Sequence, residues 1–252
     1  MPPTDDPTAT PRLVYFEMRG RAEAIRLFLH ATATAFEDHR VVTAEEWKRR
    51  KPELPFGGLP VLETGGTVLC ESHAILRHLG RATSAPIADP LTAANLDAAQ
   101  DALAESQEDL WRFNWIDDYY DQLESYANQT LRRRLERLDA WLARSASEWI
   151  GPTFGHVDCL AFGYLDEVDA FFPAVLAGFP ALSALHARVA ARPGIADYLR
   201  SDARPFVFGM GRMGPKVDPR TALPPGYAYP TPWSDPIDLS RVLAVQRRMT
   251  EG

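Results

Sequence analysis

The stretch LPVLETGGTVLC, residues 59–70, predicts a β-hairpin, because two short strand-forming runs flank a glycine turn. The segment ESHAIL, residues 71–76, follows at once. We expect Ser72 to be the N-cap of a helix that ends near Gly80. Hairpin and helix together form a β-β-α unit.

A β-α-β unit is predicted upstream of this hairpin. The run LVYF, residues 13–16, is β-branched and aromatic, as is typical of a strand. The glycine turn RGR, residues 19–21, separates this run from a helical pattern of apolar residues over 25–32. A second strand is expected around residues 36–41. The first part of the chain is therefore an α/β domain.

Helical patterns replace the strand signals from about residue 91 onward. Leucines recur at helical spacing from Leu131 to Leu142, and a second apolar stripe extends from Val157 to Val168. Pro180 and Pro193 mark the start of two later helices. Stripes of this width normally pack inward, so we expect an all-α bundle in which they form the core.

The last segment of the chain interrupts the helical pattern. Prolines and glycines are frequent after residue 204, and no helical period is seen again until residues 239–249. Five large aromatic residues nevertheless lie within it, so we expect this extension to wrap the body of the protein and to cover a pocket there. They are Phe206, Phe208, Tyr227, Tyr229 and Trp233.

These patterns predict the division of the chain. A flexible leader over residues 1–11 is indicated by its four prolines and low apolar content. The α/β domain spans 12–82, the helical domain 91–203 and the extension 204–252.

Composition limits the classes of partner. Hydrophobic residues make up 46% and charged residues 24%, as in ordinary globular proteins, and the formal net charge is −7. The densest basic run, residues 132–134, would point in different directions on a helix, so no nucleic-acid partner is expected. No apolar run approaches the roughly 20 residues that span a membrane. Cys70 and Cys159 have no metal-ligand spacing, so we expect a cytoplasmic protein without a metal site.

Four segments carry a resemblance to a known family. The segment YFEMRGRAE (15–23), EDHR (37–40) before Trp47, LPFGGLPVLE (54–63) and ESHAI (71–75) resemble sigma-class glutathione transferases, a tyrosine-type class that includes prostaglandin D synthase. The resemblance is specific over residues 13–80 and looser to about residue 200. It implies a thioredoxin-like N-terminal domain, an all-α C-terminal domain, and a homodimer that uses glutathione.

The resemblance implies two catalytic residues. Tyr15, at the end of the first strand, corresponds to the tyrosine whose hydroxyl stabilises the glutathione thiolate. Arg21 corresponds to an arginine near that thiol. From the residues alone, Tyr15 could instead be a core tyrosine and Arg21 a helix-surface residue.

Further residues match positions that hold glutathione in this family. Trp47 and Lys51 would hold its glycyl end, and a cis Leu59–Pro60 bond would direct the Leu59 backbone toward its cysteinyl part. A lysine usual in the family is Gly58 here, which removes one contact.

The γ-glutamyl end of glutathione would lie at the predicted helix start. Glu71 and Ser72 match family positions there, and helix N-termini favour anions. Glu71 stands where glutamine is common, so it would attract the ligand's ammonium group and oppose its carboxylate. Ser72 could also be an N-cap without a ligand.

Acidic residues on the first helix of the second domain are implied in a shared site. Asp97, Asp101 and Glu105 recur every four residues and line one face. In the family, the residue matching Glu105 reaches the ligand's ammonium group in the partner subunit, and Asp101 lies on the same face. A solvated acidic face is the alternative.

The resemblance also implies an electrophile pocket and a folding residue. Phe16, Met18, Trp111 and Tyr164 would line the pocket. The hydroxyl N-cap expected three residues before Asp158 is Gly155, and we expect Asp158 to support folding rather than catalysis.

Two other functions compete with the transferase. The first is a non-catalytic carrier of hydrophobic ligands with the same fold. The second is a thiol-disulfide oxidoreductase, which is disfavoured because no Cys-x-x-Cys follows the first strand.

Overall fold

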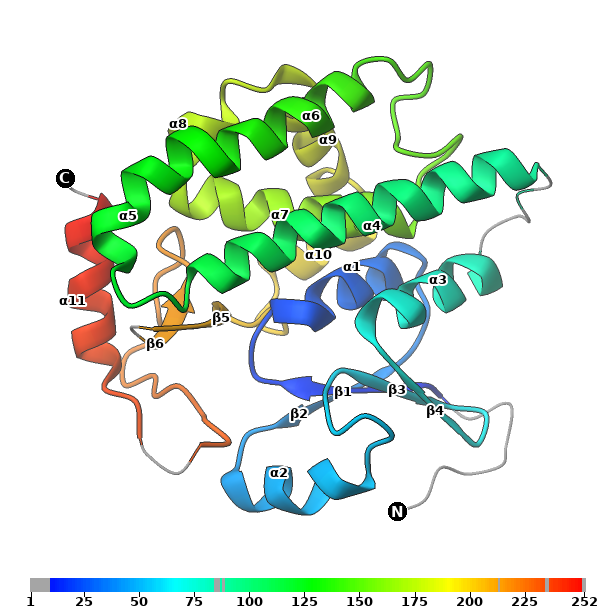
Figure 1. Cartoon of the computed structure of the whole chain (residues 1–252). Helices are drawn as coiled ribbons and strands as arrows, with labels where there is room; N and C mark the ends of the chain where they lie inside the picture. Colours follow the sequence, from blue (N-terminus) through cyan, green and yellow to red (C-terminus); the bar gives the residue numbers. More distant parts are fainter. Residues whose placement is uncertain (1–9, 84–86, 88, 213, 234–235, 251–252) are drawn as a thin grey trace.

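The structure is a computed structural model that describes residues 10–83, 87, 89–212, 214–233 and 236–250. Most of the predicted leader, residues 1–9, lies outside these ranges. Within them, an N-terminal α/β domain precedes a helical domain, and the C-terminal extension returns to contact both (Figure 1). The expected thioredoxin-like and all-α architecture is confirmed.

A four-stranded sheet forms the centre of the N-terminal domain. Its order is β2-β1-β3-β4, with β1 parallel to β2 and the other pairs antiparallel. Helices α1 and α3 cover the face toward the helical domain, whereas α2 lies on the other side (Figure 1). The bounds are β1 Arg12–Phe16, η1 Gly20–Ala22, α1 Glu23–Ala31, β2 Glu37–Val41, α2 Ala44–Arg50, η2 Lys51–Glu53, β3 Val61–Thr64, β4 Thr67–Cys70 and α3 Ser72–Thr83.

Helix α3 differs from the prediction at both ends. Its first residue is Ser72, and the carbonyl of Glu71 accepts the hydrogen bond from the Ile75 amide at 2.9 Å, so Glu71 rather than Ser72 is the cap. The helix continues past Gly80, where an added Cβ would lie 2.2 Å from the His156 ring. Gly80 therefore allows close packing of α3 on α7 and does not end the helix.

The helical domain is organised around α7, which packs against α1, α3, α4, α8 and α9. A long α4 and the consecutive helices from α5 to α6 flank it (Figure 1). The bounds are α4 Pro90–Phe113, α5 Tyr119–Ser125, the π-helix η3 Tyr126–Leu131, α6 Arg132–Leu142, α7 His156–Phe171, α8 Pro173–Leu176, α9 Pro180–Ala190 and α10 Pro193–Arg200.

Asp158 supports the start of α7. Its carboxylate accepts hydrogen bonds from the amides of Ile150 at 2.9 Å and Gly155 at 2.8 Å. Burial raises the pKa of Asp158 to about 6, against the lowering effect of these bonds. The side chain thus ties the preceding loop to the helix, as expected for a folding residue.

The C-terminal extension contains a hairpin that the sequence analysis missed. Strands β5 (Val207–Gly211) and β6 (Gly214–Val217) pair antiparallel, and helix α11 (Leu239–Thr250) packs against β6. The expectation of no strands after residue 91 was therefore wrong. Phe208 and Tyr229 are buried, whereas Trp233 is partly exposed, so the extension buries part of its aromatic surface.

A buried ion cluster attaches this extension to both domains. We use the name Asp166 cluster for Arg19, Asp166, Arg204, Asp218 and Arg220. The Arg19 guanidinium lies 2.8 Å from Asp218 and 3.3 Å from Asp166. Burial raises the pKa of Asp166, but the nearby His186 ring and the three arginine charges outweigh it and hold that pKa well below its usual range.

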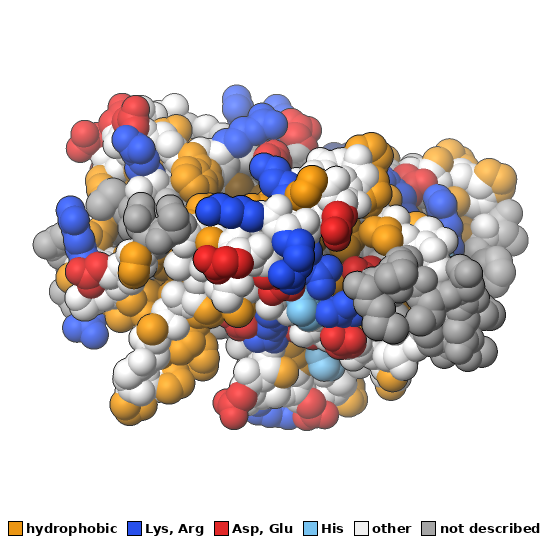
Figure 2. Space-filling model, turned by 90° about the horizontal axis from the view of Figure 1, so that it is seen from below, with side chains coloured by type: hydrophobic (Ala, Val, Ile, Leu, Met, Phe, Trp, Pro, Cys, Tyr) orange, Lys and Arg blue, Asp and Glu red, His pale blue; other side chains and the backbone are white. Residues whose placement is uncertain are grey.

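The molecular surface on the α2 side carries mixed charge. Lysine and arginine side chains are interspersed with aspartate and glutamate over this face (Figure 2). None of the helices in the described part of the chain combines the length and apolar character needed to cross a membrane.

Candidate active site

Tyr15 lies at the end of β1 with its hydroxyl in a defined position. The backbone amide of Arg21 donates a hydrogen bond to the Tyr15 oxygen at 3.2 Å, which leaves the hydroxyl proton free to be donated elsewhere. Burial raises the pKa of Tyr15, against the lowering effects of the Arg21 amide and of the Arg21 and Arg26 charges. Tyr15 is therefore a neutral hydrogen-bond donor at neutral pH.

Arg21 is held at the edge of the same site by α4. Its guanidinium lies 2.5 Å from the Glu108 carboxylate and 4.8 Å from the centre of the Trp111 ring. A planar guanidinium can pair and stack at the same time, so two contacts fix its orientation. The positive charge is thus directed to the region beside Tyr15.

A cavity of about 220 Å³ joins these groups. Its walls come from the loop after β1, from α4 and α7, and from β5. Tyr15, Met18, Arg21 and Trp111, which were expected from the sequence, all line it. The other lining residues are Gly20, Glu108, Arg112, Asn114, Trp115, Glu167, Gly209 and Met210. Apolar and charged groups therefore share one small space.

Two expected pocket residues lie elsewhere. Successive strand residues point to opposite faces, so Phe16 does not share the wall with Tyr15; it contacts Trp47 at 5.1 Å and Trp233 at 5.7 Å between ring centres. Tyr164 is fully buried in the core of the helical domain and does not line this cavity. Neither residue therefore lines this cavity.

The expected glutathione-binding residues of the N-terminal domain surround the end of the sheet. Trp47 is half-buried on α2, and the Lys51 ammonium lies 5.7 Å from the centre of its ring. The Leu59–Pro60 peptide bond is cis, as predicted. These residues belong to segments that lead into η2 and β3.

Glu71 has an unusual backbone conformation at the start of α3. Its φ of 65° lies in the left-handed region, which is uncommon for a residue other than glycine and often marks a functional site. Ser72 is buried at the first helical position. The helix N-terminus therefore offers amide groups that can bind an anion.

The acidic face of α4 is paired within the chain. Arg77 of α3 bonds to Asp97 at 2.9 Å and also to Asp101, whereas Glu105 bonds to Arg134 of α6 at 3.1 Å. Asp101 and Glu105 remain largely exposed. Neither residue lines the cavity.

Glu167 is a cavity residue that the sequence analysis did not identify. It lies on the apolar stripe of α7 and is 4% exposed. The Trp111 indole donates a hydrogen bond to its carboxylate at 3.1 Å. A buried acidic residue on the inward face of a helix is rarely without partners, and this could have indicated a site.

The extension completes the wall of the cavity. Gly209 and Met210 of β5 line it, and the Arg212 amide donates to the Asn114 carbonyl at 2.6 Å. An added Cβ at Gly211 would lie 2.9 Å from that carbonyl, so glycine permits this approach. Among the described residues, no group of three or more histidine, cysteine, aspartate or glutamate side chains could hold a metal ion.

Comparisons with known proteins identify relatives over most of the chain. Family models described as "Glutathione S-transferase, N-terminal domain" and "Glutathione S-transferase, C-terminal domain" match residues 11–81 and 108–202. A Caenorhabditis elegans glutathione S-transferase P is 33% identical over 81% of this chain and 99% of that protein. Rat hematopoietic prostaglandin D synthase is 34% identical over 75% of this chain and 94% of that protein.

Solved structures of the same two kinds of protein superpose on this chain. The Onchocerca volvulus Pi-class glutathione S-transferase superposes with a TM-score of 0.71 and 27% identity over 76% of this chain and 92% of that one. The rat prostaglandin D synthase complexed with a quinoline gives a TM-score of 0.69 and 30% identity, over 79% of this chain and 100% of that one. Both family-model matches end before the C-terminal extension.

Proposed function

The chain belongs to the glutathione S-transferase family and is a glutathione transferase, and we propose that Tyr15 activates the glutathione thiol at the cavity wall. One observation carries the assignment of Tyr15. Its hydroxyl lines the cavity, accepts the Arg21 amide, and keeps a proton that it can donate.

Glutathione supplies the sulfur nucleophile of the reaction. A hydrogen bond from Tyr15 to the sulfur favours the thiolate over the thiol and lowers the thiol pKa. Burial raises the pKa of Tyr15, so the tyrosine keeps its proton while the thiol loses one. The nearby Arg21 charge favours the same anion. Tyr15 and Arg21 thus act together on one atom.

We assign the two ends of glutathione to opposite sides of the sheet end. Trp47 and Lys51 would bind the glycyl carboxylate through the indole N–H and the ammonium. Glu71 and Ser72 would bind the γ-glutamyl end, the serine with the amides of the helix start and the glutamate with the ammonium group. The buried Ser72 and the left-handed φ of Glu71 support a ligand at this position.

The remaining contacts in this proposal come from two places. Leu59 and Pro60 would contact the cysteinyl part beside β3. Asp101 and Glu105 would complete the site from the partner subunit of a homodimer, which their exposure on α4 permits.

The second substrate would be a small hydrophobic electrophile that lies against Met18 and Trp111. The thiolate forms a bond to its electrophilic carbon, either as the final conjugate or as a step in an isomerisation. We further propose a cytoplasmic location, because Cys70 and Cys159 are both free thiols.

The variant Tyr15→Phe tests the assignment. It removes one charge-assisted hydrogen bond, worth about 1.5–3 kcal/mol, so the bound thiol's pKa should rise by about one to two units. The conjugation rate at neutral pH should fall and should partly recover as the pH rises. Thiolate absorbance of the glutathione complex against pH measures the shift.

The matched control is Tyr227→Phe, whose ring packs on Phe206 in the extension. This variant should keep the wild-type titration and rate. An unchanged titration in Tyr15→Phe would show that another group activates the thiol.

A further inference from the structure

Glu167 is a buried acid that the thiol activation described above does not use. Its carboxylate reaches the cavity from α7, where it accepts the Trp111 indole N–H. The other acid of the wall, Glu108, is paired with Arg21 and lies 3.8 Å from Arg112. The two acids therefore have different partners: Glu108 lies beside guanidinium groups, whereas Glu167 accepts a hydrogen bond from the neutral Trp111 indole.

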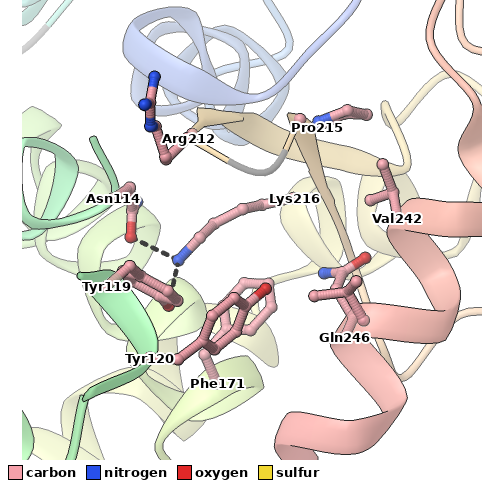
Figure 3. A pocket seen from close by; sticks show the side chains of 12 residues that line it. Asn114, Tyr119, Tyr120, Phe171, Arg212, Pro215, Lys216, Val242 and Gln246 are labelled. Atoms are coloured by element: carbon pink, nitrogen blue, oxygen red, sulfur yellow. Dashed lines mark hydrogen bonds between the residues drawn. The ribbon is translucent and has the colours of Figure 1, made fainter. Parts of the chain in front are cut away.

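The C-terminal extension supplies a positive charge, Lys216, that acts on Glu167. Figure 3 shows Lys216 extending from β6 toward Asn114 and Tyr119. Its ammonium bonds to the Asn114 side-chain oxygen and, at 3.0 Å, to the Tyr119 hydroxyl. Asn114 and Glu167 both line the cavity. The Lys216 ammonium is therefore held by a residue of the cavity wall.

The Lys216 charge favours the ionised form of Glu167. The pKa of Glu167 is nevertheless raised, because burial outweighs the Lys216 charge and the hydrogen bond from Trp111, and the Asp166 charge adds to the rise. Burial also lowers the pKa of Lys216 to about 8, against the effect of Glu167. Each charge supports the other, so removing the lysine would favour the protonated acid.

The carboxylate keeps capacity to accept a further bond. An ionised carboxylate has about four lone-pair sites, and the hydrogen bond from the Trp111 indole uses one of them. A ligand in the cavity could therefore donate a hydrogen bond to the Glu167 carboxylate beside the apolar side chains of Met18 and Met210. A buried acceptor without its bond is costly, so the site should discriminate between ligands that can and cannot supply one.

We propose that Glu167 is a specificity-determining residue whose carboxylate accepts a hydrogen bond from an O–H or N–H group of the electrophile. The enzyme then favours electrophiles that carry such a donor over apolar ones of the same size. This inference rests on the proposed function of the same cavity. It also gives the extension a role, because the Lys216 charge favours the ionised form of this acceptor.

A matched pair of substrates tests the inference. The two are short α,β-unsaturated aldehydes of equal length, one ending in a methyl group and the other with a hydroxyl in its place. The readout is the ratio of their kcat/KM values, each corrected for the uncatalysed reaction with glutathione. The wild-type ratio should favour the hydroxyl by about tenfold or more, as for a hydrogen bond to a charged acceptor.

Three variants locate the effect. Glu167→Gln is isosteric and should lower the ratio about fivefold or more. Lys216→Met, which alters a residue outside the cavity wall, should lower it in the same direction. Asp169→Asn removes an acid of the same helix that pairs with Arg220 instead, and it should keep the wild-type ratio. A wild-type ratio near one, or a ratio unchanged in Glu167→Gln, would overturn the inference.

A binding measurement separates this inference from the proposed function. The saturated alcohol and alkane analogues cannot react, and the indole N–H resonance of Trp111, assigned with Trp111→Phe, reports their binding beside Glu167. If neither aldehyde is turned over, the transferase assignment fails, but binding of the two analogues still tests the role of Glu167. Binding of the alcohol about tenfold tighter with a shifted resonance supports the role of Glu167, and equal binding of the two refutes it.

Discussion

Gly20 leaves the volume that the Tyr15 hydroxyl occupies. Its φ of 40° lies in the left-handed region, and an added Cβ would lie 2.6 Å from the tyrosine oxygen. Glycine is therefore favoured at position 20 for two separate reasons: its left-handed backbone conformation, and the space that the Tyr15 hydroxyl occupies.

Gly20→Ala should separate these two effects. The backbone strain should lower the free energy of unfolding by about 1 kcal/mol or more, and displacement of the Tyr15 hydroxyl should lower kcat/KM by roughly tenfold or more. Denaturant unfolding and conjugation of a model electrophile measure the two.

Gly65→Ala is the matched control, since its φ is 52° and no atom lies within 4 Å of the added Cβ. It should lose similar stability and keep the wild-type rate. A Gly20→Ala enzyme of wild-type activity would mean that the position of Tyr15 is unimportant.

Among the elements, the C-terminal extension is the one that links the others. The loop before η1 donates its Arg19 amide to the Val207 carbonyl at 2.8 Å, and the Arg19 side chain bonds to the Pro205 carbonyl at 2.8 Å. Arg204 lies 2.8 Å from Glu23 of α1 and 2.5 Å from Asp166 of α7. A short segment therefore connects the two domains through buried polar contacts.

Arg204→Met tests this connection. It leaves Glu23 and Asp166 buried without one of their partners, which should lower the free energy of unfolding by about 3–5 kcal/mol. The midpoint and slope of denaturant unfolding measure the loss. Arg200→Met is the control, because Arg200 makes an exposed pair with Asp197 that is worth at most about 1 kcal/mol. Equal losses in the two variants would show that the Asp166 cluster does not stabilise the fold.

The elements also show what could be predicted from sequence. The sheet and its hairpin follow from local signals, because the alternation and the turn at Gly65 are contained in a few residues. The β5–β6 hairpin was missed because Gly209 and Pro215 resemble strand breakers. Its position is instead set by Asn114 and Arg19, which are far away in the sequence.

The site was predictable to the same extent. Tyr15, Met18, Arg21 and Trp111 were expected from the family resemblance and line one cavity, and the first three lie within the motif of residues 15–23. Tyr164 was not predictable, because a tyrosine on an apolar helical stripe can face either a pocket or the core.

At the scale of the whole molecule, the proposed site requires two copies. Asp101 and Glu105 are exposed on α4 and cannot reach the cavity of their own chain. A C2 dimer is the commonest oligomer and would bring one α4 toward a partner. The chain alone therefore holds only part of the proposed glutathione site.

Solution scattering should show a homodimer at micromolar concentration. Glu105→Ala should then raise the KM for glutathione severalfold without altering the particle mass, because an ionic contact with the ammonium group is lost. Glu124→Ala, an exposed acid of α5, is the control and should leave KM unchanged. A strictly monomeric 28.1 kDa particle would contradict both the dimer and the shared role of Glu105.

The contacts of Arg19 also set an order in which the molecule is completed during translation. Arg19 leaves the ribosome long before its partners Val207 and Asp218 in the C-terminal extension. At about 5–20 residues per second, the ribosome takes roughly 10–40 s to travel between them. Over this interval the nascent chain carries Tyr15 without β5 beside it, and over the later part of it Glu167 without Lys216. The selectivity proposed for Glu167 can therefore arise only after the extension has left the ribosome.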